Sequence, residues 1–140
     1  IDFEKLVADM PQTTKLKADM EKLGKTYQDE VEGMAKKLDA KMKKYTQEQN
    51  TQTKEINEIR AKEVQQENAR YEQLRQTAYQ DMQKKQAEGL QPIIEIAQKA
   101  IEEVAATKGI LYVLDASVGK GVLVKKGEDL YAAVKAKLGF

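Results

Sequence analysis

The stretch that decides the fold is residues 16–45, which read LKADMEKLGKTYQDEVEGMAKKLDAKMKKY. Its apolar residues recur at spacings of four, three and four, and the whole pattern repeats every eleven residues: Leu16, Met20, Leu23, Tyr27, Val31, Met34, Leu38, Met42 and Tyr45. Eleven residues in three turns are about 3.67 residues per turn, a period that keeps the stripe on one face of a nearly straight helix. The other faces carry Lys, Glu, Asp and Gln, so the stretch predicts an amphipathic helix that needs a partner.

The apolar pattern stops at residues 46–54, TQEQNTQTK, which contain no apolar residue. It resumes at Ile56 and reaches Leu90. We interpret the polar stretch as the turn of a helical hairpin, with its tip at residues 50–53. The alternative is one unbroken helix whose face is locally polar.

The end of the chain has a different composition, because residues 108–140 hold five of the eight Gly. The run Ile110–Leu114 has the length and composition of a strand, and Val122–Val124 predicts a second one. The segment between them is expected to turn, and Glu128–Leu138 is expected to form a terminal helix. Upstream, the apolar stretch Ile93–Val104 predicts a helix buried in a core.

These elements predict a fold that is mainly α with a small β body: a long α-helical hairpin projecting from a β-barrel-type trimerisation body. One domain covers residues 1–140, with residues 1–12 and 90–140 in the body and residues 13–89 in the hairpin arm. Two strands and a short helix cannot close a core alone, so the body is expected to self-associate. The residues assigned to oligomerisation are Ile110, Leu111, Tyr112, Val113, Leu114, Val122, Leu123 and Val124.

The composition excludes most site chemistries. The chain has no His and no Cys, so we expect no catalytic residue, no cofactor and no metal ligand, because zinc sites, haem ligation and the common nucleophile–base pairs need those residues. Gly119-Lys120-Gly121 completes no phosphate-binding motif. The 24 Lys and Arg nearly balance 23 Asp and Glu, so nothing indicates a nucleic-acid partner.

The arms carry Met and Tyr that have two interpretations. They can fill the seam between the helices, or they can leave an adaptable apolar surface for varied partners, because Met is flexible and polarizable. The candidates for partner contact are Met34, Met42, Tyr45, Tyr71 and Met82. The charged faces of the arms are either solvated or steer unfolded polypeptide, and a peripheral contact with lipid or lipopolysaccharide stays open.

Several stretches together resemble the Skp/OmpH family over essentially the whole chain. On the arms they are Leu38-Asp39-Ala40-Lys41-Met42-Lys43-Lys44 and Leu90-Gln91-Pro92-Ile93-Ile94, and the second is similar to the Bacteroidetes branch of the family. The most specific part is the ending: Gly109-Ile110-Leu111-Tyr112-Val113-Leu114-Asp115-Ala116-Ser117, Val122-Leu123-Val124, and Glu128-Asp129-Leu130 with the residues after it.

The resemblance implies an ATP-independent holdase chaperone of the periplasm. Members are homotrimers whose helical arms enclose a cavity, where unfolded outer-membrane proteins are held and kept from aggregating. It also implies a first strand upstream of Ile1 and a removed signal peptide. Two alternatives remain at this point: a structural coiled-coil adaptor with one fixed protein partner, and a prefoldin-like chaperone, although prefoldins place their strands between the helices.

Overall fold

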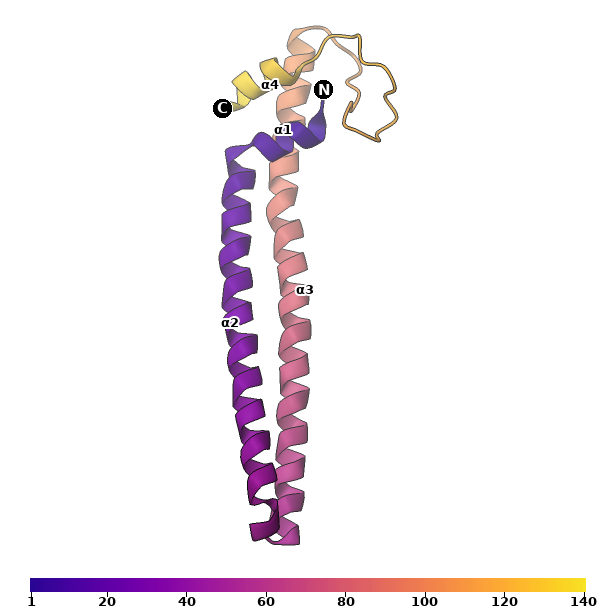
Figure 1. The fold of residues 1–140 in the computed structure, drawn as a ribbon. Helices are drawn as coiled ribbons and strands as arrows, with labels where there is room; N and C mark the ends of the chain where they lie inside the picture. The colour runs from indigo at the N-terminus through magenta and orange to yellow at the C-terminus, as the bar shows by residue number, and fades with distance from the viewer. The chain divides into compact units, whose positions relative to one another are not determined.

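The computed structural model describes residues 1–140 and is 79% helical (Figure 1). Its elements are α1 (Phe3–Asp9), α2 (Pro11–Glu48), the short 3-10 helix η1 (Gln49–Thr51), α3 (Lys54–Thr107) and α4 (Tyr131–Leu138). Contacts divide the chain into two units. The hairpin unit is Met20–Lys84, and the terminal unit combines Ile1–Asp19 with Lys85–Phe140.

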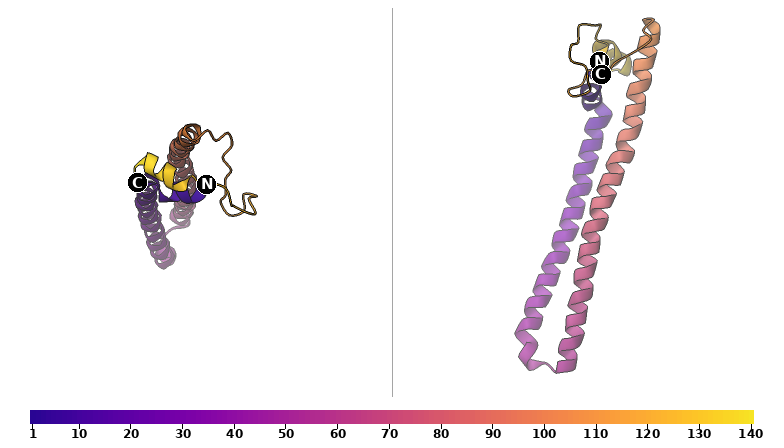
Figure 2. Two further views of the ribbon diagram at one scale, coloured as in Figure 1. Left: turned by 90° about the horizontal axis from the view of Figure 1, so that it is seen from above. Right: turned by 90° about the vertical axis from the view of Figure 1, so that its right-hand side faces the viewer.

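Within the hairpin unit, α2 and α3 lie side by side and run in opposite directions (Figures 1 and 2). The chain reverses between Glu48 and Lys54, because Gln52 is extended, with φ −108° and ψ 158°. Thr53 then caps α3, and its hydroxyl accepts a hydrogen bond from the Ile56 N–H at 3.3 Å. The unbroken helix considered from the sequence is therefore wrong, and the polar stretch is a turn.

The seam of the hairpin unit changes character along its length. Leu38 and Ala78 are buried, each 8% exposed, so this part of the seam is apolar as the stripe predicts. One turn nearer the hairpin turn, Met42 is 48% exposed, and Lys41 reaches across to α3 instead. Of the two interpretations of the Met and Tyr residues, Met42 thus has the open position, whereas Tyr45, the next residue of the stripe, still reaches across to Glu63 of α3.

In the terminal unit, α1 and α2 are joined by a sharp bend at Met10 and Pro11. Met10, which precedes Pro11, is extended with ψ 135°, as steric conflict with a following proline ring requires. Pro11 is the first residue of α2, where its missing N–H costs nothing. Asp2 caps α1 by accepting a hydrogen bond from the Lys5 N–H at 3.0 Å.

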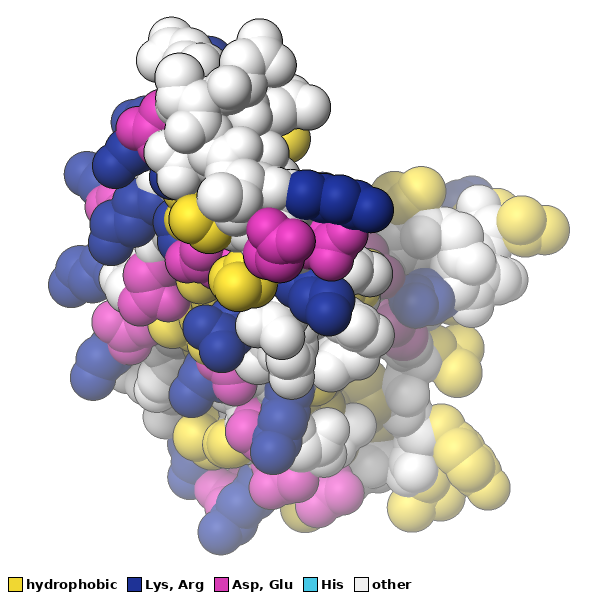
Figure 3. Space-filling view, turned by 90° about the horizontal axis from the view of Figure 1, so that it is seen from below, with side chains coloured by type: hydrophobic (Ala, Val, Ile, Leu, Met, Phe, Trp, Pro, Cys, Tyr) yellow, Lys and Arg dark blue, Asp and Glu magenta, His cyan; other side chains and the backbone are white.

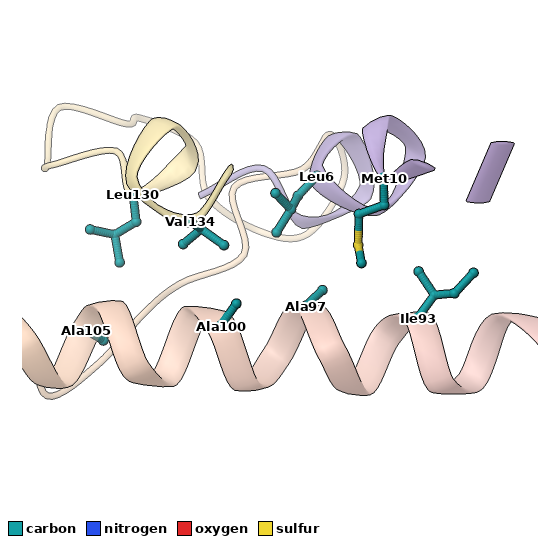
Figure 4. Packing of buried hydrophobic residues seen from close by; sticks show 8 residues of the cluster. All are labelled: Leu6, Met10, Ile93, Ala97, Ala100, Ala105, Leu130 and Val134. Carbon is teal, nitrogen blue, oxygen red and sulfur yellow. The ribbon is translucent and has the colours of Figure 1, made fainter. Parts of the chain in front are cut away.

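The core of the terminal unit lies where α1 and the start of α4 cross α3. Leu6, Met10 and Val134 have no exposed area, and all three point toward α3 (Figure 4). The facing surface of α3 is made mostly of alanines, which let the short helices approach closely. The buried residues that α3 contributes are Ile93, Ala97, Ala100 and Ala105.

The predicted β body is wrong: the structure contains no strand, no sheet and no barrel. Residues 108–130 join α3 to α4 as a loop (Figure 2), and Gly109 near its start has a φ of +67°. Its apolar run has the composition of a strand, but a strand exists only where a neighbouring segment pairs with it. The only pairing is at its end, where Ile1 donates to the Leu114 carbonyl at 3.3 Å and accepts from the Ala116 N–H at 2.7 Å. These two hydrogen bonds are too few to form the ladder that defines a pair of strands.

Two helical glycines provide a matched test of packing in each unit. A Cβ on Gly89 would lie 2.4 Å from Leu16 Cδ1, whereas a Cβ on Gly33 would have nothing within 4 Å. Gly33→Ala is expected to raise the free energy of unfolding by about 0.5–1 kcal/mol through helix propensity. Gly89→Ala is expected to lower it by about 1 kcal/mol, because overpacking outweighs that gain. Urea unfolding followed by helical circular dichroism measures both, and equal stabilisation by the two would show that Leu16 moves away freely.

Candidate functional site

The hairpin unit exposes large apolar side chains that nothing in the chain covers. The exposed fractions are 48% for Met42, 40% for Ile56, and 65% for both Ile59 and Tyr79. A further apolar residue, Val64, is half-buried beside Met42 in a groove of about 380 Å³ next to the turn. Single exposed apolar residues are ordinary, but each of these four leaves an apolar side chain open to contact with an apolar segment of another chain.

A charged cluster bridges α2 and α3 next to this groove. The Lys41 ammonium donates to Glu63 Oε1 at 2.6 Å and also contacts Glu67. The Tyr45 hydroxyl donates to the other oxygen of Glu63 at 2.6 Å. Nearer the turn, Arg60 Nη2 pairs with Glu48 Oε2 at 2.6 Å, and its guanidinium lies 4.4 Å from the centroid of the Tyr45 ring. This end of the seam is therefore held by directional polar contacts.

The cluster shifts the pKa values of its members in the directions that favour these pairs at neutral pH. Hydrogen bonding from Lys41 lowers the pKa of Glu63. Hydrogen bonding to Glu63 raises the pKa of the Lys41 ammonium and of the Tyr45 phenol. At neutral pH Lys41 therefore keeps its charge, Glu63 stays ionised and the Tyr45 phenol stays protonated, so these three side chains remain paired.

The second exposed surface lies on the loop of the terminal unit. Leu111, Tyr112 and Leu123 are 88%, 86% and 96% exposed, and Leu114, Val118 and Val124 are also open. Ile110 and Val113 of the same loop pack against the core. The loop therefore turns one side inward and presents the other as an apolar surface, which we call the loop surface.

The loop surface is attached to α1 by a buried polar junction. The Ser117 hydroxyl, on a residue that is 3% exposed, accepts a hydrogen bond from the Glu4 N–H at 3.1 Å. Asp115 Oδ1 accepts from the N–H of Phe3 at 3.3 Å and of Ser117 at 2.9 Å. These bonds satisfy N–H groups at the start of α1 that have no partner within the helix. Hydrogen bonding from Ser117 also lowers the pKa of Asp115.

The residues expected to contact partners occupy different environments. Met42 is exposed, whereas Met34, Tyr45, Tyr71 and Met82 are half-buried between α2 and α3. Sequence reasoning missed Ile56, Ile59 and Tyr79. Ile56 begins the apolar pattern that resumes after the turn, so the sequence alone did not separate it from residues that face α2. Of the residues assigned to oligomerisation, Leu111, Tyr112, Leu114, Leu123 and Val124 are exposed, and Ile110, Val113 and Val122 are half-buried.

Charges of both signs are mixed on the face at the end of the hairpin. Seen from the end that carries the hairpin turn, basic and acidic side chains interleave (Figure 3). No group of three or more acidic side chains is placed to hold a metal ion. None of the helices combines the length and the apolar character that crossing a bilayer requires. The two apolar surfaces are thus the features of the chain best suited to binding.

Comparison with protein families gives a match that covers nearly the whole chain. The sequence matches the family OmpH, described as "Outer membrane protein (OmpH-like)", over residues 1–138. The match confirms the resemblance drawn from the arms and the ending. No curated protein matches the chain.

Proposed function

The chain belongs to the OmpH-like family, and on that premise we propose that it is an ATP-independent holdase that binds unfolded outer-membrane proteins in the periplasm and prevents their aggregation. The family is one of periplasmic chaperones for outer-membrane proteins. The observation that carries the proposal for this chain is the set of uncovered apolar side chains on the hairpin unit: Met42, Ile56, Ile59 and Tyr79.

This surface suits varied unfolded clients better than one fixed partner. Its apolar residues are separated by charged and amide side chains, so no large continuous patch selects one shape. Met and Ile adapt to different side chains, which favours many weak contacts over one specific fit. A structural adaptor would instead concentrate its binding energy in a few buried anchors.

We further propose that the working form is a homotrimer joined through the loop surface. The open apolar side chains of this surface, such as Leu111 and Leu123, lie together on a single loop. Covering one such side chain contributes about 1.5–3 kcal/mol. A second and third copy of the same chain provide the matching apolar surfaces, as the resemblance to the family implies.

Replacing the exposed apolar residues of the hairpin unit tests the holding function. We expect Met42→Ser, Ile56→Ser, Ile59→Ser and Tyr79→Ser, combined in one variant, to weaken binding of an unfolded outer-membrane barrel protein by about tenfold or more, because the four truncations together remove at least about 1.4 kcal/mol of apolar contact. Light scattering of the client, diluted from urea with increasing chaperone, measures the loss of protection.

The matched control changes exposed glutamines of the same unit to Ser: Gln47, Gln65, Gln66 and Gln80. This variant should protect the client as well as the unchanged protein does. Equal protection by the apolar and the control variants would reject the assignment of these residues. If the unchanged protein gives no protection while a pull-down recovers one stoichiometric partner, the adaptor function would replace the holdase.

A further inference from the structure

We propose that the groove beside the hairpin turn binds an extended polypeptide segment, with Arg60 donating a hydrogen bond to a main-chain carbonyl of that segment while Met42 and Val64 contact its apolar side chains. We call this groove the tip groove, and its other lining residues include Tyr45, Gln49 and Asn57. The inference rests on the proposed holding of unfolded proteins and assigns part of that binding to one site.

The first argument is a donor without an acceptor. Arg60 Nη1 is buried and has no hydrogen-bond partner, although the side chain as a whole is 18% exposed. A buried polar group without a partner carries a desolvation cost, and native proteins pair nearly all such groups. Since Arg60 lines the tip groove, a ligand that occupies the groove can supply the missing acceptor.

The second argument concerns the charge that the acceptor should carry. The positive charge of Arg60 is already matched, because Nη2 pairs with Glu48 at 2.6 Å. Glu63 lies at the other end of the Tyr45 side chain, where it accepts from the hydroxyl. A carboxylate or phosphate entering beside Glu48 would bring a second negative charge to the site. A neutral carbonyl oxygen satisfies Nη1 without that repulsion.

The third argument concerns the shape of the partner. A helix uses its own carbonyls internally, whereas an extended chain leaves them free. An extended chain also points every second side chain to the same side, so a segment that presents a carbonyl to Arg60 can place apolar side chains on Met42 and Val64. Segments destined for strands of a β-barrel alternate apolar and polar residues and fit this requirement.

The entrance to the groove can open without moving the helices. Asn57 Nδ2 donates to the Gln49 carbonyl at 2.9 Å and so belongs to the turn itself. The Gln49 side chain is exposed, and exposed side chains change rotamer within nanoseconds. Since Gln49 lines the tip groove, this part of the lining can rearrange when a segment enters.

The test uses the full chain with isotope-labelled arginine side chains and methionine methyl groups. The probes are an unfolded outer-membrane barrel protein diluted from urea and an end-blocked ten-residue peptide that alternates valine and serine. We expect both probes to shift the nuclear magnetic resonance signals of Arg60 Nη1 and of the Met42 methyl group, and to leave the Met20 methyl signal in place. Arg60→Gln should weaken peptide binding by about tenfold, since a hydrogen bond to a charged donor is lost.

Arg75→Gln is the matched control. Arg75 lies on the same helix, pairs with Glu72 at 3.3 Å and lies 5.7 Å from the centroid of the Tyr71 ring, but it is exposed and does not line the tip groove. The Arg75→Gln variant should bind the peptide as tightly as the unchanged protein does. If the client is held but the Arg60 and Met42 signals do not shift, the tip groove is not a binding site for the client. Water would then be the partner of Arg60 Nη1. A peptide that shifts these signals while the client still aggregates would instead reject the holding function and keep the groove.

Discussion

Leu6→Ala is expected to detach α1 from α3 and to lower the free energy of unfolding of the terminal unit by about 3 kcal/mol. Leu6 has no exposed area, and it packs in a cluster whose α3 side consists mainly of alanines. Alanine side chains are short and stiff, so α3 cannot extend toward the space that the missing Leu6 side chain would leave. The cavity therefore persists and its full cost is felt. Urea unfolding measures the loss, and hydrogen exchange of the α1 amides shows where it occurs.

Ile59→Ala serves as the control for Leu6→Ala. Both changes truncate a large aliphatic side chain on a helix, but Ile59 is 65% exposed. The unfolding free energy of the Ile59→Ala variant should differ from that of the unchanged protein by less than about 0.5 kcal/mol, as is usual for surface substitutions. If Leu6→Ala costs no more than this control, the packing of α1 on α3 is not a determinant of stability. Faster exchange confined to α1 would show that the short helix opens locally rather than with the whole unit.

The two long helices and the terminal helix were predictable from the sequence because their signals are local, whereas α1 was not predicted. The eleven-residue stripe, the apolar-free stretch before Lys54 and the glycine at position 109 each act within a few residues. Gly109 shows this well: its φ of +67° favours glycine, and the Ile110 N–H donates back to the Ala105 carbonyl at 2.9 Å. This is a bond pattern by which a glycine in the left-handed conformation commonly ends a helix.

The loop surface was not predictable in the same way, because a strand depends on its partner. Ile110–Leu114 has strand composition, yet what it becomes is decided by which backbone lies beside it. In this chain that neighbour is Ile1 alone, and the rest of the run stays unpaired. Composition predicted that the segment is apolar and important, but it could not predict the pairing.

The candidate binding surface was partly predictable, for a geometric reason. A stripe with a fixed period identifies one face of a helix, but the line along which two helices touch can drift from that face. Lys41 crosses the seam by pairing with Glu63, whereas Met42 beside it in the sequence is 48% exposed. The sequence around Lys41 and Met42 does not show which of the two contacts α3, because that depends on the acidic residues that α3 places opposite them. Arg60 illustrates the same limit, since its unpaired nitrogen exists only in the folded seam.

Leu111→Asp combined with Leu123→Asp is expected to convert the proposed trimer into single chains. Both leucines are almost fully exposed within one chain, so the fold of that chain does not depend on them. In an assembly each aspartate would enter an apolar contact, and burying an unpaired charge there costs several kcal/mol. Because the contact repeats in every copy, the penalties add. The mass in solution should fall from about three times to about one times the chain mass of 15.8 kDa, measured by light scattering after size-exclusion chromatography.

Lys126→Asp separates this effect from a simple change of charge. It introduces the same carboxylate on the same loop, at an exposed residue that is not apolar. This variant should keep the mass of the unchanged protein, and circular dichroism should show the same helix content in all three proteins. An Asp pair that still assembles would move the interface away from the loop surface. A single-chain mass for the unchanged protein would reject the trimer itself, and the hairpin unit would then have to hold its clients without an enclosing assembly.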